Sequence, residues 1–149
     1  MAVKPIPNGY HSLTPVLTVQ GAAKLIEFLK QAFDAKENFR LAGPGGTVMH
    51  AELKIGNSMV MLGEATDEYK PMPAKIALYI EDTDAWYKRA LAAGAKSLKA
   101  PANQFYGDRG AGVTDPAGNQ WWIHTRIEDL SPDEIKKRAD AFMKQPQKA

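Results

Sequence analysis

The sequence predicts an α+β fold in which two βαβββ repeats form a curved eight-stranded mixed sheet around a cavity, followed by a separate helix. Three segments recur along the chain. LTV at 17–19 corresponds to LYI at 78–80, AFDAK at 32–36 to AAGAK at 92–96, and GNSMVM at 56–61 to GNQWWI at 118–123. The offset stays between 60 and 62 residues, which indicates an internal duplication with small insertions. We expect one domain over 1–149, with repeats at 9–64 and 74–126.

The first repeat opens with an alternating β-branched run and continues as a helix within residues 15–33. The apolar residues of that helix follow the i, i+3, i+4, i+7, i+8 spacing of one helical face: Leu25, Phe28, Leu29, Ala32 and Phe33. The turn signals GPGG and GN then predict three strands, at 36–41, 47–55 and 58–62.

The second repeat follows the same plan. A strand at 76–80 leads into a helix that begins near Asp82 and Thr83 and stops at Gly94, residues suited to a helix N-terminus and C-cap. Strands are expected at 97–98, near 107–113 and at 120–125. Beyond the repeats, SPDE at 131–134 is a capping box with proline at the first helical position, so the last helix is expected at about 131–144.

Composition excludes several classes of function. The charged fraction of 24% and the net charge of +2 are spread along the chain, so no basic cluster indicates nucleic-acid binding. The absence of cysteine excludes disulfides, thiolate catalysis and zinc–sulfur sites. No apolar run approaches the ~20 residues that span a bilayer, and the N-terminus lacks a secretory signal. We therefore expect a cytoplasmic protein that does not bind membranes.

Four segments resemble the vicinal oxygen chelate superfamily, which includes glyoxalase I, bleomycin-resistance proteins and extradiol dioxygenases. They are YHSLTPVLTVQGAAKLIEFLKQAF, VMHAELKIGNSMVML, YIEDTDAWYKRALAAGA and QFYGDRGAGVTDPAGNQWWI. The resemblance is greatest to the PhnB-like, glyoxalase-like branch and extends over residues 9–125. It implies a small-molecule ligand in a cavity between the repeats, and a homodimer, because relatives assemble their cavities across a dimer.

The resemblance also implies where a metal would be held. In metal-using members, His, Gln or Glu ligands come from the first and last strand of each half. The matching positions here are Thr14, Val60 or Met61, Lys75 and Trp122. None of these side chains suits a divalent cation that prefers carboxylate or imidazole ligands. We therefore expect no metal and no other cofactor.

Two adjacent tryptophans occupy the last strand of the second repeat. Neighbours on a strand point to opposite faces, so Trp121 and Trp122 have different surroundings. The resemblance turns Trp122 toward the cavity, together with His124, and Trp121 outward into the helix layer. An aromatic ring at the metal position suits stacking on a planar ligand, although both rings could simply be buried in the core.

Other candidate site residues have more than one interpretation. His50 and Glu52 share one strand face, either as a solvated surface, as a base with its orienting partner, or as two metal ligands joined by His124 or His11. Arg109 either pairs with its neighbour Asp108 or presents its guanidinium to an anionic ligand. The remaining candidates for the cavity wall are Tyr79, Tyr106, Lys75 and Thr14.

Three functions remain open from the sequence. The leading hypothesis is a metal-free member of the superfamily that binds a small organic ligand. One alternative is a lyase or dioxygenase with relocated metal ligands at His50, Glu52 and His124 or His11. The other is a drug-sequestering resistance protein without catalysis. The sequence does not identify the ligand.

Overall fold

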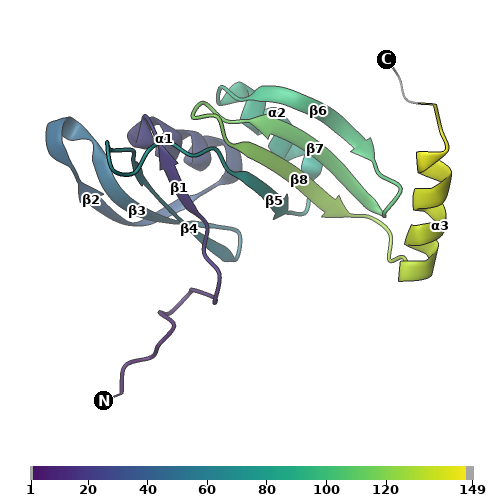
Figure 1. Cartoon of the computed structure of the whole chain (residues 1–149), viewed down its shortest axis with the longest axis horizontal. Coiled ribbons are helices and arrows are strands. Elements are labelled where there is room, and N and C mark those ends of the chain that lie inside the picture. Colours follow the sequence, from purple (N-terminus) through teal and green to yellow (C-terminus); the bar gives the residue numbers. More distant parts are fainter. Residues whose placement is uncertain (1, 147–149) are drawn as a thin grey trace.

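Two copies of one βαβββ pattern follow each other along the chain (Figure 1). In the computed structural model, which describes residues 2–146, the first copy consists of β1 (Val16–Val19), α1 (Ala22–Phe33), β2 (Lys36–Ala42), β3 (Val48–Ile55) and β4 (Ser58–Glu64). The second consists of β5 (Lys75–Tyr79), α2 (Thr83–Ala92), β6 (Lys96–Asn103), β7 (Asp108–Thr114) and β8 (Gln120–Arg126). A short 3-10 turn (Pro44–Gly46) precedes β3, and α3 (Pro132–Met143) ends the fold. Residues 1 and 147–149 of the predicted domain lie outside the described residues.

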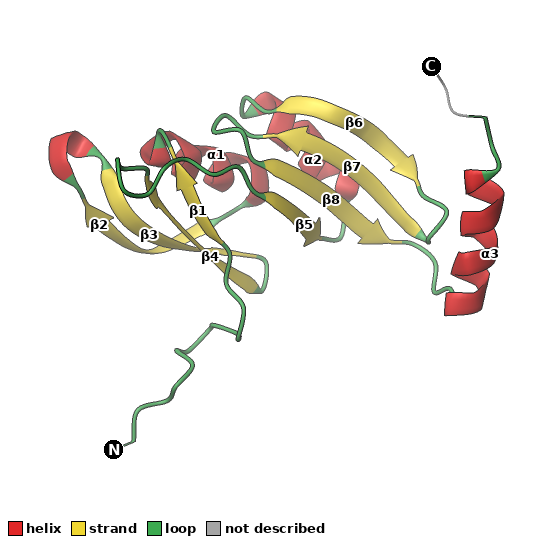
Figure 2. Cartoon of the chain, in the orientation of Figure 1, coloured by secondary structure: helices red, strands yellow, loops and turns green. Residues whose placement is uncertain are grey.

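The eight strands form two four-stranded mixed sheets, in the orders β1-β4-β3-β2 and β5-β8-β7-β6. In each sheet the first strand pairs in parallel with the last, and the other pairs are antiparallel. Helices α1 and α2 lie behind the sheets in Figure 2. The predicted fold class is confirmed, and each repeat has its own hydrogen-bonded sheet.

One face of each sheet packs on its helix, and we call the other the open face. In the first sheet, Leu17, Leu53 and Leu62 are buried toward α1, whereas Glu52 and its cross-strand neighbour Met61 lie on the open face. In the second sheet the helix side buries Val113, Trp121 and Ile123. This alternation follows from the two-residue period of a strand.

The helices begin where side chains satisfy their free backbone N–H groups. The carboxylate of Glu64, at the end of β4, accepts hydrogen bonds from the backbone N–H groups of Gly21 and Ala22 at the start of α1, at 2.8 and 3.1 Å. Asp82 caps α2 by accepting from the backbone N–H of Ala85 at 3.0 Å, as the sequence predicts.

The repeats meet where α1 packs against α2. Phe33 of α1 stacks on Trp86 of α2 at 5.8 Å between ring centroids, and lies 5.1 Å from the ring of Trp121. Arg89 donates from α2 to the backbone carbonyl of Gln31 at 3.0 Å. The junction is therefore an aromatic core shared by both halves.

Two segments extend beyond the repeats (Figure 1). The residues before β1 form an extended arm, which Tyr10 ties to the first sheet through a hydrogen bond to Glu52. Helix α3 packs at the end of the second sheet, with Phe142 at 5.1 Å from Phe105. Among the residues described, no helix is both long and apolar enough to cross a membrane.

Candidate functional site

The turn before β8 fixes the register of the two tryptophans. Asp115 is almost fully buried, and its carboxylate accepts four hydrogen bonds, from the backbone N–H groups of Ala117 and Asn119, the Asn119 amide and the Trp121 indole N–H. These bonds are 2.8 to 3.0 Å long. The DPAGNQW segment therefore locks Trp121 into the helix layer, and the strand period places Trp122 on the open face.

Glycines in β7 let two rings of β8 lie close to the backbone. A Cβ atom added to Gly112 would stand 2.6 Å from a ring carbon of Trp122, and one added to Gly110 would stand 3.3 Å from Nδ1 of His124. The Trp122 indole N–H donates to Gln120 at 3.1 Å, and the ammonium of Lys75 lies 5.6 Å from its ring centroid. Trp122 and His124 thus lie side by side on the open face of the second sheet.

A buried carboxylate stands beside His124. Asp108 is 5% exposed, and its Oδ2 accepts a hydrogen bond of 2.6 Å from the hydroxyl of Tyr79. The same oxygen lies 3.5 Å from Nδ1 of His124. The imidazole also stacks on Tyr79, at 5.3 Å between centroids, and has Tyr106 at 6.4 Å.

The two tyrosines of this cluster titrate above their usual range. The hydrogen bond to Asp108 raises the pKa of Tyr79, and burial adds to the effect. Burial raises the pKa of Tyr106, with a smaller contribution from the charge of Asp108. Both hydroxyls therefore remain protonated and available as donors at neutral pH.

The first sheet presents a separate polar group. On its open face, Nε2 of His50 lies 3.1 Å from a carboxylate oxygen of Glu52, and Tyr10 donates to the other oxygen. The hydrogen bond from Tyr10 lowers the pKa of Glu52, and His50 adds to this effect. Burial, together with the bond to Glu52, raises the pKa of Tyr10 to about 12.

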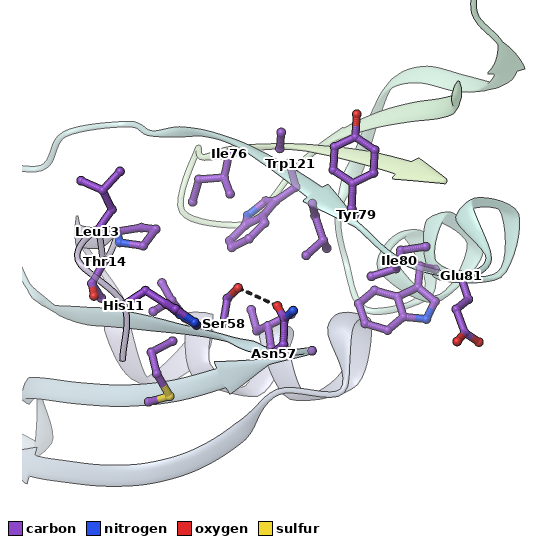
Figure 3. A pocket seen from close by; sticks show the side chains of 18 residues that line it. His11, Leu13, Thr14, Asn57, Ser58, Ile76, Tyr79, Ile80, Glu81 and Trp121 are labelled. Atoms are coloured by element: carbon purple, nitrogen blue, oxygen red, sulfur yellow. Dashed lines mark hydrogen bonds between the residues drawn. The ribbon is translucent and has the colours of Figure 1, made fainter. Parts of the chain in front are cut away.

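A cavity of about 830 Å³ lies where the repeats meet (Figure 3). Its apolar wall comes from β5 and the aromatic core, with Ile76, Leu78, Trp86 and Trp121. The N-terminal arm and the β3–β4 turn add polar groups, including His11, Thr14, Asn57 and Ser58. The volume lies within the range of small-molecule sites, about 300–1,000 Å³.

Residues 11–123 match the family described as the Glyoxalase/Bleomycin resistance protein/Dioxygenase superfamily. The chain belongs to this superfamily. It is 38% identical over 136 residues to uncharacterised proteins of Mycobacterium bovis and Mycobacterium tuberculosis, covering 84% of this chain and 90% and 80% of theirs. The crystal structure of TioX from a Micromonospora species is similar, with a TM-score of 0.68, 21% identity, and 78% and 99% of the two chains covered. The crystal structure of a glyoxalase/bleomycin resistance protein/dioxygenase family enzyme from Burkholderia phytofirmans is also similar. Its TM-score is 0.62 and its sequence identity is 18%, with 76% of this chain and 97% of that chain covered.

The metal positions of the superfamily do not fit a metal in this chain. Of the two alternatives on β4, Met61 lies on the open face and Val60 is buried on the other. The β5 and β8 positions hold the ammonium of Lys75 and the ring of Trp122, which lie against each other. Within residues 2–146, no three His, Asp or Glu side chains gather into a group that could hold an ion. These positions therefore offer no carboxylate or imidazole to a divalent cation.

The structure distributes the predicted site residues over three places. Thr14 and Tyr79 line the cavity, and His50 with Glu52 lie on the open face of the first sheet. Four further candidates lie together on the open face of the second sheet, with Tyr79 at its edge. They are Trp122, His124, Lys75 and Tyr106. Trp121 and Trp122 point to opposite faces, as predicted.

The surroundings of Trp122 and Arg109 differ from those of the cavity between the repeats. Trp122 is not among the residues that line this cavity, whereas Trp121 and Trp86 are. The guanidinium of Arg109 binds Asp84 at 2.5 and 2.9 Å and Asn103 at 3.0 Å on the helix side of β7.

The sequence interpretation omitted two residues of these sites. Trp86 lines the cavity. It lies on helix α2 and stacks on Phe33 of the other repeat, a contact that the sequence pattern of one repeat does not indicate. Asp108 is buried beside His124, whereas the sequence indicates it only as a partner of Arg109. Adjacent strand residues point to opposite faces, so the strand period argues against that pairing.

Proposed function

We propose that this protein binds a small, largely apolar organic molecule in the cavity between its repeats, without a resident metal. The cavity itself carries the proposal. Its volume of about 830 Å³ fits such a ligand, and its walls combine two indole rings with aliphatic side chains of β5. His11, Glu81 and Tyr79 are the only ionisable groups among the lining residues, which favours a ligand without strong charge.

The alternatives have less support. A lyase or dioxygenase with a relocated metal needs a third ligand beside His50 and Glu52, and the described residues provide no such group. Sequestration without chemistry uses the same cavity and differs from an enzyme only in the absence of turnover. The sequence motifs favour assignment to the PhnB-like branch of the superfamily.

The test uses the neutral fluorescent probe N-phenyl-1-naphthylamine. We expect saturable binding of about one probe per cavity, with increased probe fluorescence as water is excluded. Ser58 is exposed and lines the cavity, and its hydroxyl bonds only to the neighbouring Asn57 side chain. Ser58→Phe should therefore fill the cavity without disturbing the core, and should reduce binding at least tenfold.

Two controls separate the cavity from the rest of the surface. Lys96→Phe adds the same ring at an exposed position of β6, and Trp122→Phe alters an indole that does not line the cavity. Both should bind the probe as the wild type does. Equal binding by Ser58→Phe, or a probe signal that never saturates, would contradict the proposal.

We also infer a homodimer. The open faces and the arm expose large apolar side chains, among them Leu13, which is 90% exposed, and Val16, Phe39 and Leu41. Soluble monomers rarely expose large apolar patches, and symmetric pairing of identical chains is the common way to cover them.

A further inference from the structure

We propose that the N-terminal arm, residues 2–15, is a strap that closes the cavity between the repeats, and that the hydrogen bond from Tyr10 to Glu52 is its latch. The inference rests on the proposed function, because the strap controls how a ligand enters and leaves that cavity. Two observations carry it. The arm forms part of the cavity wall, and it is attached to the first sheet by very few polar contacts.

The arm closes one end of the cavity. In Figure 3 its side chains lie at the opposite end of the hollow from Ile80 and Glu81. The arm supplies four of the lining residues: His11, Leu13, Thr14 and Pro15. Displacement of the arm would therefore widen the entrance and remove polar groups from the wall in one movement.

Little else holds the arm in place. It contains no helix or strand, and only Tyr10 and Thr14 are partly buried among residues 2–15. In the part of the chain that the structure describes, the hydroxyl of Tyr10 makes the one hydrogen bond that joins residues 2–14 to the rest of the fold. Segments with so few buried contacts open locally at a low free-energy cost.

The arm has a fixed end at the start of β1. The carbonyl of Pro15 accepts a hydrogen bond of 3.0 Å from the backbone N–H of Met61 on β4. Beyond this point the parallel pairing of β1 with β4 begins. Release of Tyr10 therefore frees residues 2–14 to swing about Pro15 while the first sheet stays intact.

The latch lies outside the cavity, on the open face of the first sheet. Glu52 accepts from Tyr10 on one carboxylate oxygen, and its other oxygen lies 3.1 Å from Nε2 of His50. This hydrogen bond lowers the pKa of Glu52, so the carboxylate is charged at neutral pH, and hydrogen bonds to charged groups are the stronger ones. Neither Tyr10 nor Glu52 lines the cavity, so a change in ligand exchange on mutation of either acts through the arm.

The test measures the rates at which N-phenyl-1-naphthylamine enters and leaves the cavity, by stopped-flow fluorescence. Tyr10→Phe keeps the ring and removes the latch. Because the strap must open for both steps, we expect the association and dissociation rate constants to rise together, each about tenfold. The Kd should change less than either rate, because the latch acts on the free and bound protein alike. Glu52→Gln keeps an acceptor oxygen without the charge and should raise both rates by a smaller factor.

Matched controls separate the latch from other effects. Tyr69→Phe removes the hydroxyl of an exposed tyrosine that does not line the cavity, and should leave both rates unchanged. Ser58→Phe confirms that the probe occupies the cavity. Circular dichroism and sedimentation would show that each variant keeps the fold and the assembly state of the wild type.

A second readout follows the arm without any ligand. The chain has no cysteine, so Ser12→Cys, at an exposed position of the arm, places a single nitroxide label there. Its electron paramagnetic resonance spectrum should show a larger mobile fraction when Tyr10→Phe is added, and no change when Tyr69→Phe is added.

The outcomes distinguish the strap from the cavity. Equal rates in wild type and Tyr10→Phe, or equal label mobility, would overturn the strap and leave the proposed function standing. Faster dissociation alone, with a proportional rise in Kd, would show that the arm only contacts the ligand and would overturn the strap as well. A wild-type protein that does not bind the probe would contradict the proposed function, and the strap with it.

Discussion

The contact between Gly112 and Trp122 makes a quantitative prediction about stability. An alanine Cβ at position 112 would stand 2.6 Å from one carbon of the indole ring and 2.8 Å from two others, whereas ordinary contacts begin at 3.4 Å. The ring would have to move by about 0.8 Å, an overpacking that costs ~1–3 kcal/mol. Because Trp122 is half-buried and can tilt outward, we expect Gly112→Ala to destabilise the fold by about 1.5 kcal/mol.

A double-mutant cycle with Trp122→Ala isolates this contact. Without the ring nothing opposes the new methyl group, and alanine then stabilises by ~0.4–1 kcal/mol because it restricts the unfolded chain. The free energy of unfolding, from urea titrations followed by far-UV circular dichroism, should therefore reveal a coupling of ~2 kcal/mol between the two positions. If Gly112→Ala costs the same in both backgrounds, the ring of Trp122 does not rest on this glycine.

Three further predictions concern metal, assembly and pH. Protein purified without chelator should hold no stoichiometric transition metal, and one equivalent per chain whose removal lowers Tm would contradict this. Sedimentation at micromolar concentration should show a dimer, because pairing covers the exposed apolar side chains. A 16.3 kDa species alone would contradict the homodimer. The pKa of Tyr10 rises from 10.0 to about 12 on folding, so its stabilising effect is complete below pH 10 and is lost as the pH rises toward 12. The difference in unfolding free energy between wild type and Tyr10→Phe should shrink across that window, and a constant difference would refute the linkage.

Most of the fold could be predicted because each repeat encodes its own pattern. The duplication offset, the helical spacing around Phe28 and Phe33 and the turn glycines indicate the order of strands and helices in both repeats. Strand β6 is longer than the predicted 97–98. Pro101 and the small residues near it hide the strand pattern in the sequence, but an edge strand tolerates proline. The division into two sheets depends on contacts between repeats, which the pattern within one repeat does not specify.

The candidate site was less predictable for the same reason. The strand period was sufficient to place Trp121 and Trp122 on opposite faces and His124 beside Trp122. It could not show that Trp86 and Trp121 meet Phe33 of the other repeat, because that contact joins residues far apart in the sequence. Nor could it show that Asp84, on a helix, holds the guanidinium of Arg109.

The separation of the strands into two sheets also bears on how the chain folds. In the residues described, every pair of named strands closes within one repeat, and the two longest-range ladders join Val16 to Met61 and Lys75 to Gln120. Each half can therefore nucleate on its own local contacts, with little loop-closure entropy lost between the halves. The aromatic junction around Phe33 would form last, as two preformed units dock. Native-state hydrogen exchange should then reveal two cooperative units of distinct stability, with the amides of β3 and β7 reporting on different openings.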